Sequence, residues 1–210
     1  MPRPIVVSFY TDEFYKTHAE RLRRSCCGCK WPHRIIAMPD QGGWVQNCGM
    51  KAKVMLAARL TEKKRPVLWI DADGEIVREP TILRETKAEF AVRAEPGKRT
   101  KRPTGREIMS LPENWPADVS PRWFNSGTIF FSKAKRAVEM LERWVALTEE
   151  RPNDWDQWTL QQAWADVQPQ TLWLPQGYCR ITRMHRGRVP PDDLTCIRHE
   201  LASTQRRVTR

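Results

Sequence analysis

Three apolar segments alternate with two segments of helical spacing in the first 70 residues, and this alternation constrains the fold most strongly. Ile5–Phe9, His33–Met38 and Pro66–Ile70 are rich in β-branched and aromatic residues, as buried strands are. Between them, apolar residues recur every three or four positions in two segments, one capped by Thr11-Asp12 and the other starting at about Asn47. Strand, helix, strand, helix, strand is typical of a parallel α/β sheet.

The second half of the chain is less regular but continues in the same way. It predicts two further strands and two further helices: Glu89–Val92, Gly127–Ser132, Ala134–Thr148 and Asp154–Trp164. No internal repeat or linker divides the chain. We therefore expect one α/β domain over residues 1–203, with a mixed, mostly parallel central sheet flanked by helices, and a basic tail at 204–210.

Composition excludes several classes of protein. Hydrophobic residues make up 40% and aromatic residues 9% of the 210 positions, too many for a chain that stays disordered. The apolar stretches, such as Val54–Ala58, are far shorter than the roughly 20 residues that span a bilayer. The run at Ile5–Phe9 is too short for a signal peptide. We expect a soluble protein in the cytoplasm.

The six cysteines leave two interpretations open. Cys26, Cys29, His33 and Cys48 are of the residue types that bind zinc, although the second half of the usual paired-ligand spacing is missing. Reduced thiols buried on a helix face explain the cysteines without a metal. Disulfides are not expected, since a chain with this much apolar content needs no covalent staples.

Two carboxylates, Asp71 and Asp73, directly follow the predicted strand Pro66–Ile70. Ligands in open α/β folds bind at the carboxyl ends of the strands. Mg²⁺ and Mn²⁺ take oxygen ligands and share their coordination with phosphate groups. The motif therefore predicts a divalent-cation site that binds a phosphorylated ligand. The alternative is a turn with two solvated aspartates before Gly74.

This motif resembles the Asp-x-Asp signature of nucleotide-sugar-dependent glycosyltransferases of the GT-A fold. Further segments resemble the same enzymes, the family-8 type in particular, in the same order from residue 5 to about 203. Trp158 stands where that type usually has an aspartate. The matching residues are Tyr10-Thr11 after the first strand, Lys51 on the second helix, Asn125-Ser126-Gly127 entering a central strand, Asp156-Gln157 opening a helix, and His199 near the end.

The resemblance implies a Rossmann-like GT-A fold and a nucleotide-sugar donor, with UDP favoured as the nucleotide. It implies that Asp71, Asp73 and His199 bind Mn²⁺ or Mg²⁺. It makes Asp156 and Gln157 catalytic, Asp156 as a base or as a carboxylate that stabilises an oxocarbenium-like centre; a helix N-cap is the alternative role for Asp156. The implied donor-binding residues are Tyr10, Thr11, Lys51, Asp71, Asp73, Asn125, Ser126 and Gly127.

Ten tryptophans exceed the usual frequency of this residue. Trp144, Trp158 and Trp164 fall at helical spacing and are expected in the core. An indole ring in a loop can stack on a sugar or on a base. The tryptophans in predicted loops are Trp44, Trp115 and Trp123.

The net charge of +11 is concentrated in two segments. Residues 97–106 hold five basic and no acidic residues, and residues 180–210 hold eight arginines against three acidic residues. The pyrophosphate of a donor needs only a metal and one or two cations, so the surplus favours a polyanionic acceptor. A solvated basic surface is the alternative. The acceptor contacts are assigned to Lys98, Arg99, Lys101 and Arg102.

Three functions stay open. The charge favours transfer of a sugar to a hydroxylated base in DNA, as some phage-encoded enzymes do. The first alternative is synthesis of a bacterial surface polysaccharide, where basic residues would face anionic lipid. The second is a phosphohydrolase of the haloacid-dehalogenase type, whose nucleophile motif resembles Asp71-Ala72-Asp73-Gly74 but normally follows the first strand. Nothing in the sequence indicates the oligomeric state.

A DNA acceptor predicts salt-sensitive binding. The affinity for DNA should fall with log K decreasing by about 0.7–0.9 per log unit of salt for each phosphate neutralised. Replacing Lys98, Arg99, Lys101 and Arg102 by Ser should flatten this slope in a fluorescence-anisotropy titration, while hydrolysis of the donor without acceptor stays unchanged. Binding of anionic vesicles without salt-sensitive DNA binding would instead favour the surface-polysaccharide function.

Overall fold

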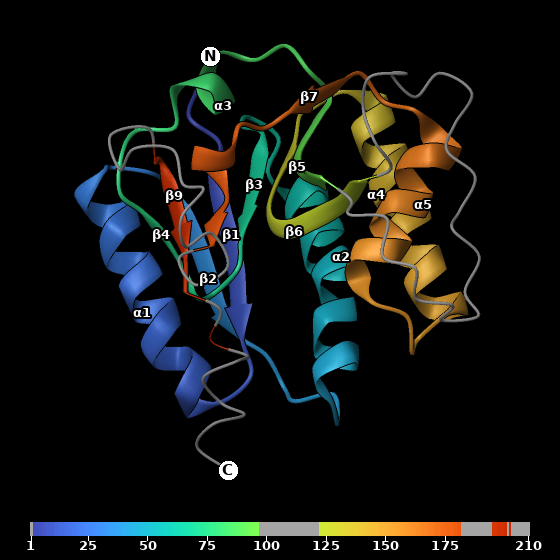
Figure 1. Cartoon of the computed structure of the whole chain (residues 1–210), viewed down its shortest axis with the longest axis horizontal. Coiled ribbons are helices and arrows are strands. Elements are labelled where there is room, and N and C mark those ends of the chain that lie inside the picture. The colour runs from blue at the N-terminus through green and yellow to red at the C-terminus, as the bar shows by residue number, and fades with distance from the viewer. Residues whose placement is uncertain (1, 97–121, 182–194, 201, 203–210) are drawn as a thin grey trace.

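A computed structural model describes residues 2–96, 122–181, 195–200 and 202 (Figure 1). Asp12 caps the first helix as predicted, since its side chain accepts the backbone N–H of Tyr15 at 2.9 Å. The elements in chain order are β1 (Ile5–Tyr10), α1 (Glu13–Gly28), β2 (His33–Ala37), α2 (Trp44–Thr61), β3 (Val67–Ile70), β4 (Gly74–Ile76), α3 (Thr81–Glu85), β5 (Phe90–Pro96), β6 (Arg122–Phe131), α4 (Lys135–Glu150), α5 (Asp156–Val167), β7 (Thr171–Trp173), the 3₁₀ turn η1 (Gln176–Tyr178), β8 (Arg180–Ile181) and β9 (Ile197–His199).

Six strands form one mixed sheet in the order β2-β1-β3-β6-β5-β7. β1 pairs in parallel with β2 and β3, β5 pairs in parallel with β7, and β6 runs antiparallel to its neighbours β3 and β5. Three short strands form a second sheet in the order β4-β9-β8. The predicted α/β domain with a mixed, mostly parallel sheet is therefore confirmed.

Helices cover both faces of the six-stranded sheet (Figure 1). α2, α4 and α5 pack on one face, and α1 with the small sheet packs on the other. Alternate residues of β3 contribute to the two cores, Val67 and Trp69 to the first and Leu68 and Ile70 to the second. The apolar spacing of the predicted helix Ala134–Thr148 gives it one apolar face. This inner face of α4 is confirmed, because its residues are fully buried: Ala137, Met140, Leu141, Trp144 and Leu147.

The prediction for α2 is wrong in two respects. The helix begins at Trp44, three residues before the predicted start, and Asn47 lies inside it, where its Oδ1 accepts the N–H of Gln41 at 2.8 Å. The apolar spacing places Met50, Val54, Ala57, Ala58 and Leu60 on the inner side. Val54 and Ala58 are buried, but Ala57 is exposed and Leu60 is 47% exposed, whereas Lys51 is buried. Apolar residues surround much of this helix, so their spacing does not determine which side faces the sheet.

Two other element starts differ from the prediction. β6 begins at Arg122, five positions before Gly127, because its pairing with β5 continues past the polar Asn-Ser-Gly segment. α5 begins at Asp156 rather than Asp154, since Trp155 has an extended backbone and takes the N-cap position. Asp156 is therefore the first residue of the helix, and the N-cap role considered for it is wrong.

The cysteines do not form the zinc site considered above. Cys26 lies in the core on the α1 side of the sheet, whereas Cys48 lies on α2, which packs on the opposite face. All six thiols are free. Burial raises the pKa of the Cys26 thiol to about 12, so this residue is one of the reduced, buried thiols of the other interpretation.

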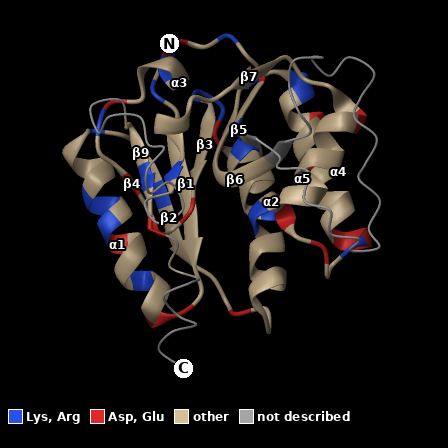
Figure 2. Cartoon of the chain, in the orientation of Figure 1, with Lys and Arg blue, Asp and Glu red and all other residues tan. Residues whose placement is uncertain are grey.

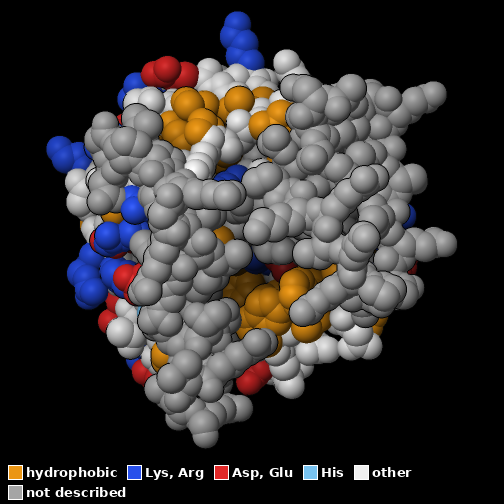
Figure 3. All heavy atoms as spheres, viewed as in Figure 1, with side chains coloured by type: hydrophobic (Ala, Val, Ile, Leu, Met, Phe, Trp, Pro, Cys, Tyr) orange, Lys and Arg blue, Asp and Glu red, His pale blue; other side chains and the backbone are white. Residues whose placement is uncertain are grey.

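Helices of the described segments are too short or too polar to cross a membrane. Charged residues lie along the helices on both faces of the sheet (Figure 2). Hydrophobic side chains reach the visible face in two places, one near α3 and one over the lower part of α2 (Figure 3). The second place adjoins the site described below.

The two faces of α2 predict different responses to truncation. Met55→Ala should lower the free energy of unfolding by about 2–5 kcal/mol, because Met55 is fully buried and its loss leaves a cavity. Leu60→Ala, on the same helix but 47% exposed, should change it by less than about 0.5 kcal/mol. Urea unfolding followed by circular dichroism measures both values. Equal losses would contradict the orientation of the helix.

Candidate active site

The turn between β3 and β4 carries the two aspartates of the Asp-x-Asp motif. β3 is buried along its whole length and ends at Ile70, so Asp71 and Asp73 leave the end of a central strand. The N–H of Gly74 donates to the carbonyl of Asp71 at 2.7 Å. A Cβ at position 74 would lie 2.4 Å from Ile70 Cγ2 and 3.0 Å from the Asp71 carbonyl oxygen, so this tight turn requires glycine.

β6 bulges beside this turn. Its register with β5 shifts between Val92 and Arg93, which leaves the Asn-Ser-Gly segment at the irregularity. Asn125 Oδ1 accepts the N–H of Gly127 at 2.9 Å, and the carbonyl of Gly127 accepts the N–H of Asp71 at 2.9 Å. The bulge therefore joins the predicted Asn-Ser-Gly segment to the Asp-x-Asp turn.

The ammonium group of Lys51 lies at the centre of the site. Its Nζ is 2.9 Å from Asp71 Oδ1 and 2.8 Å from Asp156 Oδ2. It also donates to the carbonyl and hydroxyl oxygens of Ser126, each at 3.1 Å. The Trp69 ring centre is 5.4 Å from Nζ, within range of a cation–π contact. Lys51 therefore connects α2 with the end of β3, the bulge of β6 and the start of α5.

Burial governs the electrostatics of this cluster. The side chains of Lys51 and Asp156 are each 5% exposed, whereas that of Asp71 is 36% exposed. Burial alone would lower the pKa of Lys51, but the negative charges of Asp156 and Asp71 raise it above its ordinary value. The lysine therefore stays protonated. Asp156 depends on it, because an unpaired buried carboxylate is costly.

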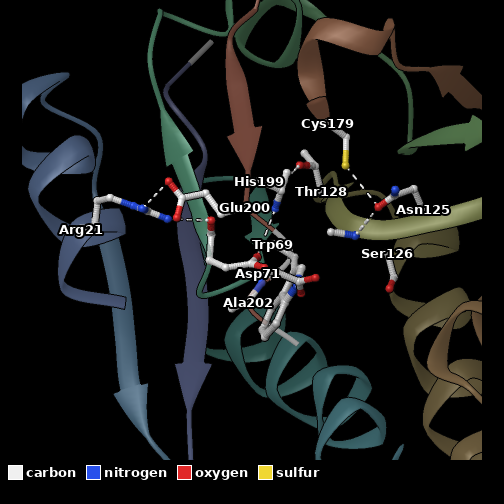
Figure 4. A network of polar contacts seen from close by, with 12 residues as sticks. Arg21, Trp69, Asp71, Asn125, Ser126, Thr128, Cys179, His199, Glu200 and Ala202 are labelled. Carbon is white, nitrogen blue, oxygen red and sulfur yellow. Dashed lines mark hydrogen bonds and ion pairs between the residues drawn. The ribbon is translucent and has the colours of Figure 1, made fainter. Parts of the chain in front are cut away.

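β9 brings His199 against Asp73. His199 Nδ1 is 3.5 Å from Asp73 Oδ1, and its Nε2 is 3.0 Å from Thr128 Oγ1 (Figure 4). The other oxygen of Asp73 accepts the N–H of Ala202 at 2.8 Å. Burial alone would lower the pKa of His199, but the Cys179 sulfur and the Asp73 carboxylate raise it to about 10. Residues far apart in the sequence thus converge on one turn.

A comparison with protein families agrees with this arrangement. The family described as nucleotide-diphospho-sugar transferase matches residues 6–186, a span that includes Lys51, both motif aspartates and Asp156. The chain belongs to the nucleotide-diphospho-sugar transferase family. The predicted glycosyltransferase class is therefore confirmed, and the phosphohydrolase alternative is wrong. No curated protein matches the chain.

Solved glycosyltransferase structures have a similar fold. A glycosyltransferase involved in glycosylation of the major capsid of PBCV-1 is 12% identical, with a TM-score of 0.64 over 99% of this chain and 98% of that one. GlyE of Streptococcus pneumoniae TIGR4 is 17% identical, with a TM-score of 0.57 over 94% and 55%. The galactosyltransferase LgtC is 11% identical, with a TM-score of 0.55 over 94% and 87%. These likenesses confirm the predicted GT-A-like fold.

The other predicted residues of this transferase are placed as follows. Tyr10 ends β1 and Thr11 follows it; β1 is the parallel neighbour of β3, so both lie at the edge of the sheet that carries the Asp-x-Asp turn. Gln157 is half-buried in the first turn of α5. The predicted acceptor residues and the basic tail lie outside the described residues: Lys98, Arg99, Lys101, Arg102 and residues 204–210.

Three further residues of the site were not among the predictions. The indole N–H of Trp69 donates to Asp71 Oδ1 at 2.6 Å. The two residues are two positions apart at the end of a strand, and this spacing places side chains on the same face, so the sequence could have predicted their contact. Arg21 on α1 pairs with Glu200 at 2.6 Å. Cys179 Sγ lies 3.1 Å from the asparagine side chain of the bulge. Neither of the latter two belongs to a recognisable motif.

The residues predicted to bind a divalent cation are brought together in part. Asp73 and His199 face each other, and carboxylate oxygen and imidazole nitrogen are both ligands of Mn²⁺. Asp71 Oδ1 instead contacts Lys51 and the indole of Trp69. Across the described segments, no three His, Cys, Asp or Glu side chains gather closely enough to hold an ion.

The ion-pair cluster predicts a specific pattern of stability. Lys51→Met should lower the free energy of unfolding by about 3–5 kcal/mol, because it leaves Asp156 buried without its counter-charge. Adding Asp156→Asn should recover part of this loss, since the remaining group is neutral. Urea unfolding of both variants measures the difference. A double variant less stable than Lys51→Met would contradict the expected recovery.

Proposed function

We propose that the cluster around Lys51 binds the nucleotide-sugar donor and transfers its sugar to an acceptor hydroxyl. The contact of Lys51 with both Asp71 and Asp156 is the observation that carries this proposal. Asp156 is buried, whereas Asp71 is partly exposed. The cluster therefore has an inner carboxylate fixed by the fold and an outer one that a ligand can reach.

Asp156 suits the stabilisation of positive charge better than the transfer of a proton. In the transition state of glycosyl transfer, the anomeric carbon takes on oxocarbenium-like positive charge. A carboxylate held in place by its contact with Lys51 can stabilise that charge without any rearrangement. Protonating Asp156 would instead leave the Lys51 ammonium buried with less counter-charge. Gln157, next in the chain, offers an amide to the hydroxyl groups of the sugar.

The other parts of the donor are assigned to residues by the position of those residues at the ends of neighbouring strands. Tyr10 and Thr11 follow β1, one strand away from the Asp-x-Asp turn, and we assign the nucleotide base to them. Asn125, Ser126 and Gly127 adjoin the cluster, where a glycine lets a ligand approach the backbone closely. Uracil as the base, in a UDP-sugar donor, remains a prediction from the family resemblance.

The proposal also includes a divalent metal ion at the donor site. Asp71, Asp73 and His199 would hold Mn²⁺ or Mg²⁺, and the ion would stabilise the negative charge that develops on the diphosphate leaving group. The facing pair of Asp73 and His199 supports this assignment. Because the protein gathers no three-ligand cluster in its described part, the ion should bind together with the diphosphate.

The DNA acceptor remains a prediction. It rests on the charge of residues 97–106, which lie outside the described residues. Neither the family nor the similar structures identify an acceptor for this chain.

A thermal-shift screen of UDP-, GDP- and dTDP-sugars, each with and without Mn²⁺, tests the donor and the metal. One nucleotide sugar should raise the melting temperature, and more so with Mn²⁺ present, because a ligand that binds only the folded state stabilises it. Mn²⁺ alone should have little effect. Stabilisation by Mn²⁺ alone would contradict an ion that arrives with the donor, and no response to any nucleotide sugar would contradict the proposed donor site.

The Asp-x-Asp turn can be tested by a near-isosteric change. Asp73→Asn keeps an oxygen that can accept the N–H of Ala202, so the fold should persist. Metal-dependent donor binding, measured by calorimetry, should weaken by at least about tenfold because the carboxylate charge is lost. Asp166→Asn, which removes an aspartate paired with Arg143 on the surface, is the matched control and should bind normally. Unchanged donor binding by Asp73→Asn would exclude the turn from the metal site.

A further inference from the structure

Three tryptophans with partly exposed rings touch one another beside the site. Trp44 opens α2 and Trp155 caps α5; they are 45% and 47% exposed, and their ring centres lie 5.8 Å apart at an interplanar angle of 85°. Trp158, predicted in the core, is half-buried, with its ring 6.0 Å from that of Trp155. We call these three residues the tryptophan ridge.

The ridge is unusual for a surface. Single exposed apolar side chains are common and need no explanation, but adjoining exposed indoles keep a large apolar area in water. Trp44 and Trp155 are two of the five large hydrophobic residues that the described segments expose. Figure 3 shows hydrophobic side chains gathered over this lower part of α2. Such an area on a monomer commonly binds a ligand.

The segment that presents Trp44 is held in place by its own hydrogen bonds. Asp40 Oδ1 accepts the N–H of Gly42 at 3.0 Å and the side-chain N–H of Asn47 at 2.9 Å. The side chain of Gln46 donates to that of Asn153 at 3.1 Å, which joins the start of α2 to the loop before α5. The ridge is therefore fixed before any ligand arrives, which lowers the entropic cost of binding.

The ridge adjoins the reacting groups. Trp155 immediately precedes Asp156, whose carboxylate is 2.8 Å from Lys51 Nζ. The first turn of α5 fixes the ridge relative to this carboxylate, since the N–H of Trp158 donates to the carbonyl of Trp155 at 2.9 Å. Because Trp155 and Asp156 are consecutive, a molecule lying on the ridge would bind next to the residue that contacts Lys51.

The chemistry around the ridge favours a neutral sugar over a polyanion. Residues 40–47 and 152–158 contain three aspartates and several amides but no lysine or arginine. Figure 2 shows Asp and Glu, in red, on the loops that lead into α2 and α5. Nucleic acid needs cations for its phosphates. A pyranose instead needs an aromatic ring for its C–H face and amide or carboxylate groups for its hydroxyls.

We propose that the tryptophan ridge is the acceptor subsite and that the acceptor is a neutral saccharide whose pyranose ring packs on Trp44 and Trp155. This inference rests on the proposed function, because it assigns the acceptor of the same reaction. The Trp158 ring contacts that of Trp155. The amides of Gln46 and Asn153, which belong to the segments that carry Trp44 and Trp155, can bind hydroxyl groups of the sugar.

Saturation-transfer difference NMR on the full chain tests the ridge without any need for turnover. The probes are glucose, galactose, N-acetylglucosamine, rhamnose, lactose and cellobiose. At least one should show transfer to its ring C–H protons. Trp44→Ala and Trp155→Ala should each raise its dissociation constant by about 3–10-fold, in line with the contribution of an aromatic contact. Trp155→Phe should retain most of the binding.

Leu60→Ala is the matched control, because Leu60 lies on the same helix with the same exposure as Trp155, 47%. It should leave saccharide binding unchanged. No binding by any probe, or equal binding by the Trp44→Ala/Trp155→Ala variant, overturns the proposal. So does a ridge that binds oligothymidylate and none of the sugars, which would instead support a nucleic-acid acceptor. The two proposals can fail separately. Failure of the nucleotide-sugar screen would refute the donor site, whereas the NMR experiment measures saccharide binding to the ridge in the absence of donor.

Discussion

The contact of the Lys51 ammonium with Asp71 and Asp156 is the interaction on which the site depends. It joins α2, the end of β3, the bulge of β6 and the start of α5. These elements contribute Lys51, Asp71, Ser126 and Asp156, respectively. None of these elements forms the site alone. Because Lys51 and Asp156 are both buried, the charge of each compensates for the desolvation cost of the other. This pairing fixes the geometry of the cluster.

The mixed sheet makes this convergence possible. β3 lies between the parallel pair β1 and β2 and the antiparallel strand β6, so its end meets the bulge of β6 directly. Two cores on opposite faces hold the sheet between helices. Polar groups of the site therefore sit on a rigid apolar support, and the transferase needs little rearrangement to present charges to its donor.

Periodicity and motif spacing predicted the features that depend on local sequence. The first three strands, the inner face of α4 and the Asp-x-Asp turn follow from apolar pattern and residue type. The orientation of α2 did not, because its apolar residues surround the helix and only tertiary packing places Lys51 inward. The contacts of Arg21 and Cys179 could not be predicted either, since each depends on a partner 52 or more positions away. The ridge was predicted only in part: Trp44 was named as a ring that could stack on a sugar, but Trp155 was not considered and Trp158 was placed in the core.

The pairing of β9 with β4 has a consequence for how the protein is made. β4 follows the Asp-x-Asp turn immediately, yet the Arg198–Glu75 pair between the two strands joins residues 123 positions apart. On the ribosome, β1 to β3 can pair early with their helices. His199 reaches Asp73 only after nearly the whole chain has been translated. A nascent chain therefore carries the aspartates of the turn long before it carries the histidine that contacts Asp73, so this contact is among the last to form during synthesis.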